Sequence, residues 1–272
     1  MNPIFKKIPN DNWLTDLDQY RIKEKPLLPK KPKNKGWYCK GPWYSDDGED
    51  GVLDYLFEYI NDVNKYAVDI GSAHGYGGSH VRYLADKYGW GTTEIDGKRW
   101  KRMHPRIKNE IITPNNICEL LTKYGTPKNF DLLSLDIDSM DWYVLEKLLL
   151  GDFRPSVAIV EFNPIFEYNE GYVVKYDKTY KKDGTSQYGA SVKAYEMLMN
   201  KYNYTLVHIF PKGVNNLLFI SNNFILPTII IDTIKNMHSK SYIEHHKIKG
   251  NKKNYISKEN LIKNKFNKLT QI

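Results

Sequence analysis

Three carboxylates follow an apolar run in the middle of the chain, at Asp136, Asp138 and Asp141. The run before them, from Leu132 to Leu135, predicts a buried strand. Carboxylates at the end of such a strand cost free energy unless they bind a cation, accept hydrogen bonds or exchange a reacting proton. Asp136 and Asp138 point to the same face of an extended chain, because side chains alternate along a strand. This pair is the first candidate for a chemical site.

The next apolar strand along the chain also ends in polar groups, Glu161 and Asn163. Ligands bind beyond the carboxyl ends of parallel strands, so the two strand ends should meet there. The predicted metal ligands are Asp136, Asp138, Glu161 and Asn163, because such oxygens suit Mg²⁺ or a similar hard cation. Without a cation, crowding would raise the pKa of one carboxyl group, and Asp138 is a predicted general base. The alternative is that Asp136 only caps the following helix, which Asp141 is expected to start.

A glycine-rich turn, Asp69-Ile-Gly71-Ser-Ala-His74-Gly75-Tyr-Gly77-Gly78, joins an earlier predicted strand to a helix. The dinucleotide template G-x-G-x-x-G fails here, because His80 stands where the third glycine should be. An acid at the strand end suits the cationic groups of S-adenosylmethionine better. Asp96, at the end of the second predicted strand, is placed to bind ribose hydroxyls. The predicted contacts of this cofactor are Asp69, Gly71, Ser72, His74, Gly75, Asp96, Asn115 and Asp136.

Two more side chains are candidates for catalysis, His74 and Lys193. The loop that holds His74 should border the methyl donor, so this imidazole could serve as the base in place of Asp138. Lys193 lies early in a predicted helix after Gly189-Ala-Ser191 and could reach the same cleft. The alternative is that Lys193 is an ordinary solvent-exposed lysine on a helix. His80 and His208 are expected to be structural or exposed.

Short apolar strands alternate with helices along the chain, which predicts a parallel sheet with right-handed crossovers. Predicted strands cover 66–70, 92–95, 110–113, 131–137, 156–162, 204–210 and 216–221, with predicted helices over 48–61, 79–87, 116–123, 142–150 and 190–202. The last two strands are separated by a short Pro-Lys-Gly connection, which predicts an antiparallel hairpin. The expected fold is α/β, a Rossmann-like class I methyltransferase fold with a mostly parallel seven-stranded sheet.

The positive charge of the chain is concentrated at its ends. The formal net charge is +8, made of +6 in residues 1–40, −6 in 41–234 and +8 in 235–272. The expected organisation is a Pro-rich arm over 1–44, a methyltransferase domain over 45–225, and a Lys/Asn-rich extension over 226–272, expected to be helical. An acidic middle disfavours nucleic acid as a partner, since a domain that binds phosphate backbones is usually basic.

Cysteine content and hydropathy favour a cytoplasmic protein. Cys39 and Cys118 lie far apart and make neither a metal pair nor a disulfide framework. The N-terminus lacks an apolar signal region, and the longest apolar run, around Ile225 to Ile231, is too short to span a bilayer. The expected partner is a small-molecule or glycan hydroxyl acceptor, with no membrane span. A homodimer is compatible with the sequence.

From about Ser45 to Ser221 the chain resembles the FkbM-type methyltransferase family. The motifs that carry the resemblance are Gly48-Glu-Asp-Gly51, Val68-Asp-Ile-Gly71, Thr113-Pro-Asn-Asn-Ile117, Leu133-Ser-Leu-Asp-Ile-Asp138, Val160-Glu-Phe-Asn-Pro164 and Gly189-Ala-Ser191. The resemblance implies an S-adenosylmethionine-dependent O-methyltransferase acting on a hydroxyl of a sugar, nucleotide sugar or glycan. The acids at the two strand ends add the expectation of assistance by a divalent metal. His74 replaces an Asp common in the family, and Ser139-Met140 replaces its usual Gly-Asn.

Two other interpretations stay open at the level of the sequence. The first is a methyltransferase that acts on RNA or another nucleic acid, which the basic termini favour. A non-catalytic binding protein on a methyltransferase fold is the other, because a fold alone does not establish an activity. Carboxylates retained at two strand ends argue against the second, since they are costly in a protein that has no use for them.

Overall fold

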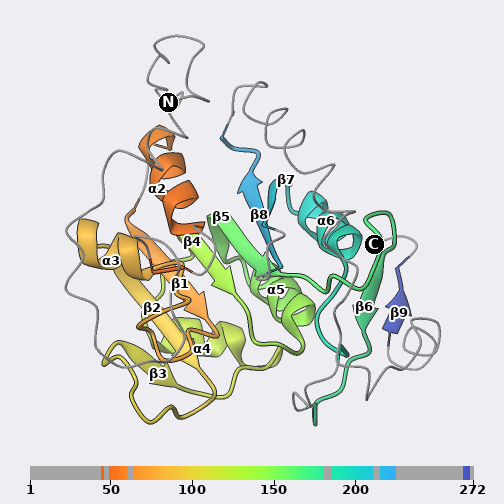
Figure 1. Cartoon of the computed structure of the whole chain (residues 1–272), viewed down its shortest axis with the longest axis horizontal. Coiled ribbons are helices and arrows are strands. Elements are labelled where there is room, and N and C mark those ends of the chain that lie inside the picture. Colours follow the sequence, from red (N-terminus) through yellow and green to blue (C-terminus); the bar gives the residue numbers. More distant parts are fainter. Residues whose placement is uncertain are drawn as a thin grey trace.

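A seven-stranded sheet forms the centre of the molecule (Figure 1). The computed structural model describes residues 44–45, 49–60, 64–180, 186–210, 215–224 and 266–269. The strands are β1 (Tyr66–Ile70), β2 (Gly91–Asp96), β3 (Ile107–Asn109), β4 (Asn129–Leu135), β5 (Arg154–Glu161), β7 (Tyr204–Phe210) and β8 (Asn216–Ser221). Their order is β3-β2-β1-β4-β5-β8-β7, with β8 antiparallel to both of its neighbours. This topology is the Rossmann-like class I methyltransferase fold, and the predicted fold class is confirmed.

Helices cover both faces of the sheet (Figure 1). They are α2 (Glu49–Tyr59), α3 (Arg82–Tyr88), α4 (Ile117–Lys123), α5 (Asp141–Leu150) and α6 (Val192–Lys201). Side chains alternate along each strand, so β4 sends Leu133 to one core and Leu132 to the other. The first core packs against α4, α5 and α6, and the second packs against α2 and α3. Both faces of the parallel strands are therefore buried, which explains their continuous apolar sequences.

The third strand differs from its prediction. We expected a strand over 110–113, but β3 covers Ile107–Asn109 and pairs with β2 from Glu94 to Asp96. The second strand ends at Asp96, whose carbonyl accepts the Glu110 amide at 3.1 Å, so residues after Glu110 have no neighbouring strand with which to pair. The prediction of a strand at 110–113 was therefore wrong, because apolar residues form a strand only where a neighbouring strand is available for pairing.

A second, two-stranded sheet was not predicted. It joins β6 (Tyr172–Val174) to β9 (Phe266–Lys268), which pair antiparallel. The amide of Leu269 extends the pairing with a 2.7 Å hydrogen bond to the Gly171 carbonyl. Residues 266–268 thus form a strand within the 226–272 extension that we expected to be helical; the rest of that extension, and residues 1–43 of the predicted arm, lie outside the described residues.

None of the described helices has the length and apolar character needed to cross a membrane. The longest of them, α2, has 11 residues, whereas a transmembrane helix needs about 20 apolar residues.

A buried ion pair ties α2 to the central sheet. Nε2 of His80 lies 3.7 Å from a carboxylate oxygen of Glu49, and its Nδ1 lies 2.9 Å from the Ser134 hydroxyl. The Asn216 amide, on β8, donates to the same Glu49 oxygen at 3.1 Å. Burial opposes charge on both partners, but their mutual attraction raises the pKa of His80 to about 9 and lowers that of Glu49 to about 2. His80 is therefore a structural residue, as predicted.

Replacing Glu49 with Gln is expected to lower the free energy of unfolding by about 3 kcal/mol near neutral pH, because it leaves a buried imidazole without its counter-charge. His80 has a raised pKa, so its contribution is complete below pH 6.5 and is lost as the pH rises through about 9. Glu49 has a lowered pKa, so its contribution is present above pH 4.5 and is lost as the pH falls through about 2. Urea unfolding across this range measures both limbs.

The control for this substitution is Glu119→Gln, which removes an exposed carboxylate on α4. Its unfolding curve should follow that of the unaltered protein at every pH. Equal stability of Glu49→Gln and Glu119→Gln would contradict the ion pair.

Candidate active site

The loop after β1 brings the carboxyl ends of β1 and β4 into close contact. Gly71 has a φ of +92°, and a Cβ atom added there would lie 1.6 Å from the carbonyl oxygen of Asp136. The amide of Gly71 donates to Ile95 on β2 at 2.9 Å, while the amide of Asp136 donates to Ile70 on β1 at the same distance. Only glycine combines this backbone conformation with this approach. Gly71 thus fixes the predicted cofactor loop against the acid-bearing strand.

Two other predicted cofactor residues, Asp69 and Ser72, are engaged within the protein. The Ser72 hydroxyl donates to the backbone carbonyl of Asp69 at 2.7 Å, and the Asp69 carboxylate accepts a 3.0 Å hydrogen bond from Ser79. Burial raises the pKa of Asp69 to about 6, against the opposing charge of His80. These bonds hold the Asp69 and Ser72 side chains inside the loop.

Asp96 ends β2 with its carboxylate already holding the adjacent loops. One oxygen accepts the Ala73 amide at 2.8 Å, and the other accepts the Lys98 amide at 2.7 Å and the Trp100 indole at 3.2 Å. A carboxylate offers about four lone-pair positions, so one remains for a ligand hydroxyl. Burial raises the pKa of Asp96 despite these three donors.

His74 and Gly75 lie on the β2 side of this edge. The His74 carbonyl accepts the amide of His104 at 3.0 Å, and its imidazole ring packs against Trp100 with centroids 5.9 Å apart. A Cβ on Gly75 would come within 2.6 Å of Ile107, so that glycine permits the two loops to pack. His74 therefore belongs to an aromatic group on the predicted cofactor side of the site.

Three acids meet where β4 and β5 end. Asp136, Asp138 and Glu161 each offer one carboxylate oxygen within 4.8 Å of the others. Within the described part of the chain, one buried oxygen of Asp136 and one of Glu161 have no hydrogen-bond partner. Buried oxygens of this kind are uncommon, and a cation or a hydroxyl donor bound here would satisfy them. The structure thus brings together three of the four predicted metal ligands.

The electrostatics of this acid cluster disfavour full ionisation. Burial, then the charges of Asp141 and Asp138, raise the pKa of Asp136 to about 7. Burial and the charge of Asp136 raise the pKa of Glu161 well above its usual range. At neutral pH the pair therefore shares a proton unless a cation replaces it.

Asp141 holds the turn that presents Asp138. Its two carboxylate oxygens accept the amides of Ile137 at 2.7 Å and Ser139 at 2.8 Å. Asp138, between those amides, has a φ of +55°, a conformation that non-glycine residues rarely adopt. Asp141 is also the first residue of α5, as expected. The positive φ falls on Asp138 itself, and not on the Ser139-Met140 pair that replaces Gly-Asn.

Two tyrosines that lie near the acid cluster are not among the predicted site residues. Tyr195, on α6, is fully buried, and its hydroxyl has no hydrogen-bond partner among the described residues. Burial, followed by the charge of neighbouring acids, raises the pKa of Tyr188 and of Tyr195. Both phenols therefore stay protonated and can donate hydrogen bonds. Both tyrosines lie close in sequence to Gly189-Ala-Ser191, which could have indicated them. Their position beside the acid cluster, however, depends on how α6 packs against the sheet.

The remaining predicted site residues lie around this cluster. Asn163 is buried, and its amide donates to the carbonyls of Ser186 at 2.8 Å and Tyr188 at 2.9 Å, while its oxygen accepts the Ile165 amide at 3.2 Å. It anchors the segment that carries Tyr188, and its role as a ligand stays a prediction. Lys193 is half-exposed and forms a 3.4 Å ion pair with Glu196 on α6.

Asn115 is exposed in the turn that precedes α4. The neighbouring Asn116 organises this turn, since its side-chain oxygen accepts the amide of Thr113 at 2.8 Å and its amide donates to Ile111 at 2.8 Å. Asn115 itself is exposed, and its contact with the cofactor stays a prediction.

A hydrogen-bonded wall stands beside the acid cluster. The amide of Gly189 donates to Ser139 at 2.8 Å, next to Asp138, and the Gly189 carbonyl accepts the amide of Val174 on β6 at 2.9 Å. The strand β9 then pairs with β6 on its outer side (Figure 1). Segments far apart in the sequence thus form one boundary of the site.

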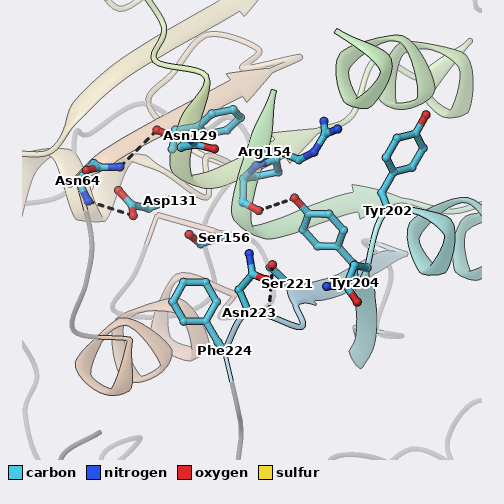
Figure 2. Close-up of a pocket in the computed structure, with 13 residues that line it drawn as sticks. Asn64, Asn129, Asp131, Arg154, Ser156, Tyr202, Tyr204, Ser221, Asn223 and Phe224 are labelled. Carbon is cyan, nitrogen blue, oxygen red and sulfur yellow. Dashed lines mark hydrogen bonds between the residues drawn. The ribbon is translucent and has the colours of Figure 1, made fainter. Parts of the chain in front are cut away.

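A pocket of about 450 Å³ lies at the opposite edge of the sheet, where the parallel strands begin (Figure 2). Its polar groups are largely satisfied within the protein. Asp131 accepts the amides of Asn64 at 3.1 Å and Tyr66 at 2.9 Å, and the Tyr204 hydroxyl donates to Pro155 at 2.7 Å. In a sheet of this kind ligands bind at the carboxyl edge, so the acid cluster and not this pocket is the candidate active site.

No protein-family model and no curated protein sequence matches the chain. Among solved structures, it is similar to the N-terminal domain of EvdMO1 crystallised with SAH bound, over 79% of this chain and 97% of that one, with 11% identity and a TM-score of 0.41. The same domain crystallised with SAH and D-fucose is similar over 76% and 95%, with 10% identity and a TM-score of 0.41. A likeness of this size defines no function, and the FkbM-type resemblance stays a prediction from its motifs.

Proposed function

We propose that this protein is an S-adenosylmethionine-dependent O-methyltransferase that acts on a hydroxyl of a sugar, nucleotide sugar or glycan. The observation that carries the proposal is the pair of unpartnered carboxylate oxygens on Asp136 and Glu161, at the carboxyl edge of a class I methyltransferase sheet. A hydroxyl acceptor needs a group that takes its proton, and neighbouring sugar hydroxyls need acceptors of hydrogen bonds. The acid cluster supplies both.

The donor would lie over β1 and β2, on the loop that Gly71 fixes. S-Adenosylmethionine supplies an electrophilic methyl group on a sulfonium centre when bound. Asp69 and Ser72 would support this loop from inside, since their side chains are hydrogen-bonded within the protein. The remaining lone pair of Asp96 would accept a ribose hydroxyl, and the negative cluster around Asp136 favours a cationic group beside it.

A divalent cation fits the residues at β4 and β5. The unpartnered oxygens of Asp136 and Glu161, with Asp138 in reach, form a hard oxygen set of the kind that Mg²⁺ prefers. Asn163 is the candidate for a further oxygen. When bound, Mg²⁺ would lower the pKa of an acceptor hydroxyl and orient it. Without it, the shared proton between Asp136 and Glu161 balances the charge.

Asp138 is the proposed general base. Attack of the acceptor oxygen on the methyl group forms a C–O bond, breaks the S–C bond and releases the hydroxyl proton, which Asp138 accepts. Asp141 is a positioning residue, since its carboxylate holds the two amides that flank Asp138. His74 and Lys193 are secondary candidates, because the first packs with Trp100 and the second pairs with Glu196.

The first experiment is calorimetry with S-adenosylmethionine, followed by transfer of labelled methyl groups to a panel of free sugars, nucleotide sugars and glycans. Binding of the donor with transfer to a sugar hydroxyl is expected. Absence of donor binding at millimolar concentration would overturn both the sugar and the nucleic-acid versions of the enzyme and leave a non-catalytic protein. Transfer only to RNA would replace the sugar acceptor with a nucleic acid.

Removal of divalent cations with EDTA is expected to lower the rate of transfer by about tenfold or more, and Mg²⁺ should restore it. Direct titration with Mg²⁺ should show binding that Glu161→Gln abolishes, because that change removes an otherwise unpartnered carboxylate oxygen. The control is Glu167→Gln, an exposed residue six positions later. Full turnover in EDTA, unchanged by added Mg²⁺, would leave these acids as bases and hydrogen-bond acceptors only.

A further inference from the structure

The segment that follows β2 and ends with β3, here called the basic loop, is strongly basic, although the middle of the chain is acidic. Residues 97–109 contain six Lys or Arg and no Asp or Glu. The exposed members of this set are Lys98, Arg99, Lys101, Arg102 and Lys108. The rest of 41–234 carries a net charge of −12. Positive charge in the domain is therefore concentrated on one side of the candidate active site.

Neutralising partners account for only part of this basic loop. Arg106 is held by Glu94 at 2.8 Å and Asp86 at 3.2 Å. The ammonium of Lys98 lies 3.9 Å from the centre of the Trp100 ring.

Further along the same loop, Arg99, Lys101 and Arg102 form no ion pair with any residue in the described part of the chain. Three exposed cations within four positions repel one another, and a bound anion would relieve that repulsion.

Aromatic rings accompany the charges. Tyr76 is 51% exposed, and its ring packs edge-on against His104 with centroids 5.3 Å apart. Trp100 is half-buried between Lys98 and His74. Cations beside accessible aromatic rings are a common arrangement for binding molecules that contain both a phosphate and a nucleobase, and here Lys98 lies over Trp100 and Arg82 over Tyr76.

The basic loop is part of the carboxyl edge, because the amide of His104 bonds to His74 in the loop after β1. Neighbouring strands lie about 4.8 Å apart, so β2 and β4 are separated by roughly 10 Å. A free monosaccharide held at Asp138 would not reach the basic loop. A sugar joined through a diphosphate to a nucleoside would reach it.

We propose that the basic loop over 97–109 binds the diphosphate of the acceptor, and that the acceptor is a nucleoside diphosphate sugar. This inference rests on the proposed function, since it names the substrate class of the same site. A short anion fits better than a long nucleic acid, because the phosphates of a polymer would extend beyond the basic loop, and the rest of residues 41–234 carries a net charge of −12.

The test uses the full chain saturated with S-adenosylhomocysteine, so that the adenosine site is filled, and titrates it with uridine diphosphate. Replacing Lys101 and Arg102 together with Ala should weaken this binding by about tenfold, as expected for loss of charge-assisted contacts at an exposed site. The matched control, Lys147→Ala with Lys201→Ala, removes the same charge from exposed positions on α5 and α6. It should bind uridine diphosphate as the unaltered protein does.

The same double variant should raise KM for a nucleoside diphosphate sugar and leave KM for a free sugar unchanged. Equal affinity of the Lys101/Arg102 variant and the control variant for uridine diphosphate would overturn the inference. Tighter binding of an oligoribonucleotide, lost in the same variant, would assign the loop to nucleic acid instead. Binding of S-adenosylmethionine distinguishes this inference from the proposed function. If the donor does not bind, the proposed function is wrong. If the donor binds and uridine diphosphate does not, only this inference is wrong.

Discussion

Replacing Asp138 with Asn is expected to lower the rate of methyl transfer by about 10²–10⁴-fold, because an amide cannot take up the proton of the acceptor hydroxyl. The substitution should leave the fold intact. Asp138 has a φ of +55°, and Asn adopts this left-handed conformation more readily than most other residues. The measurement is single-turnover transfer of a labelled methyl group, with donor affinity followed by calorimetry. Donor affinity should stay close to that of the unaltered protein.

Asp152→Asn is the matched control. Asp152 also has a positive φ, +61°, but its side chain is 84% exposed and pairs with Arg154 at the surface. The two substitutions make the same chemical change in the same backbone conformation. Equal activity of the two variants would remove Asp138 from the role of base and shift that role to His74.

The Gly71→Ala substitution is expected to prevent stable folding or to lower the free energy of unfolding by more than about 4 kcal/mol. A Cβ atom would lie 1.6 Å from the Asp136 carbonyl oxygen, and that backbone atom cannot rotate away. Separating the two strand ends would also break the hydrogen bond between Asp136 and Ile70. Denaturant unfolding and soluble yield measure the effect. Any folded fraction should bind S-adenosylmethionine poorly, since the loop would be displaced.

Gly125→Ala tests whether positive φ alone could explain such a loss. Gly125 has a φ of +71°, but a Cβ there would meet no atom within 4 Å. Its replacement should cost only about 1–2 kcal/mol, the usual strain of a left-handed alanine. A Gly71→Ala protein as stable as Gly125→Ala would mean that β1 and β4 do not approach as closely as described.

Much of the fold could be predicted from apolar runs and their spacing. The strands of the central sheet other than β3 were expected within a few residues of their observed ends, and so was the reversed last strand. Those strands are buried on both faces, so their sequences are continuously apolar and easy to recognise. The edge strand β3 was misplaced because only Ile107 of its three residues is buried. Pairing, and not hydrophobicity, sets its position.

The acids of the candidate site could be predicted from the sequence, whereas the residues around them could not. Asp136, Asp138 and Glu161 follow apolar strands, so the sheet alone places them at one edge. The role of Asp141 depends on a side chain folding back onto two amides, which spacing does not reveal. The role of Tyr195 depends on where α6 docks. The basic loop is visible in the sequence, but averaging charge over the whole middle of the chain concealed it.

The pairing of β6 with β9 makes the wall of the site a late event in synthesis. A ribosome makes β6 long before it makes β9, and domains generally fold from the N-terminal side as they emerge. The seven-stranded sheet can therefore form first, while the outer side of β6 stays an unpaired strand edge. Such an edge is a template for aggregation until its partner arrives. Translation that stops before residue 266 would release a chain with a complete seven-stranded sheet and an unpaired β6 edge near its acid cluster.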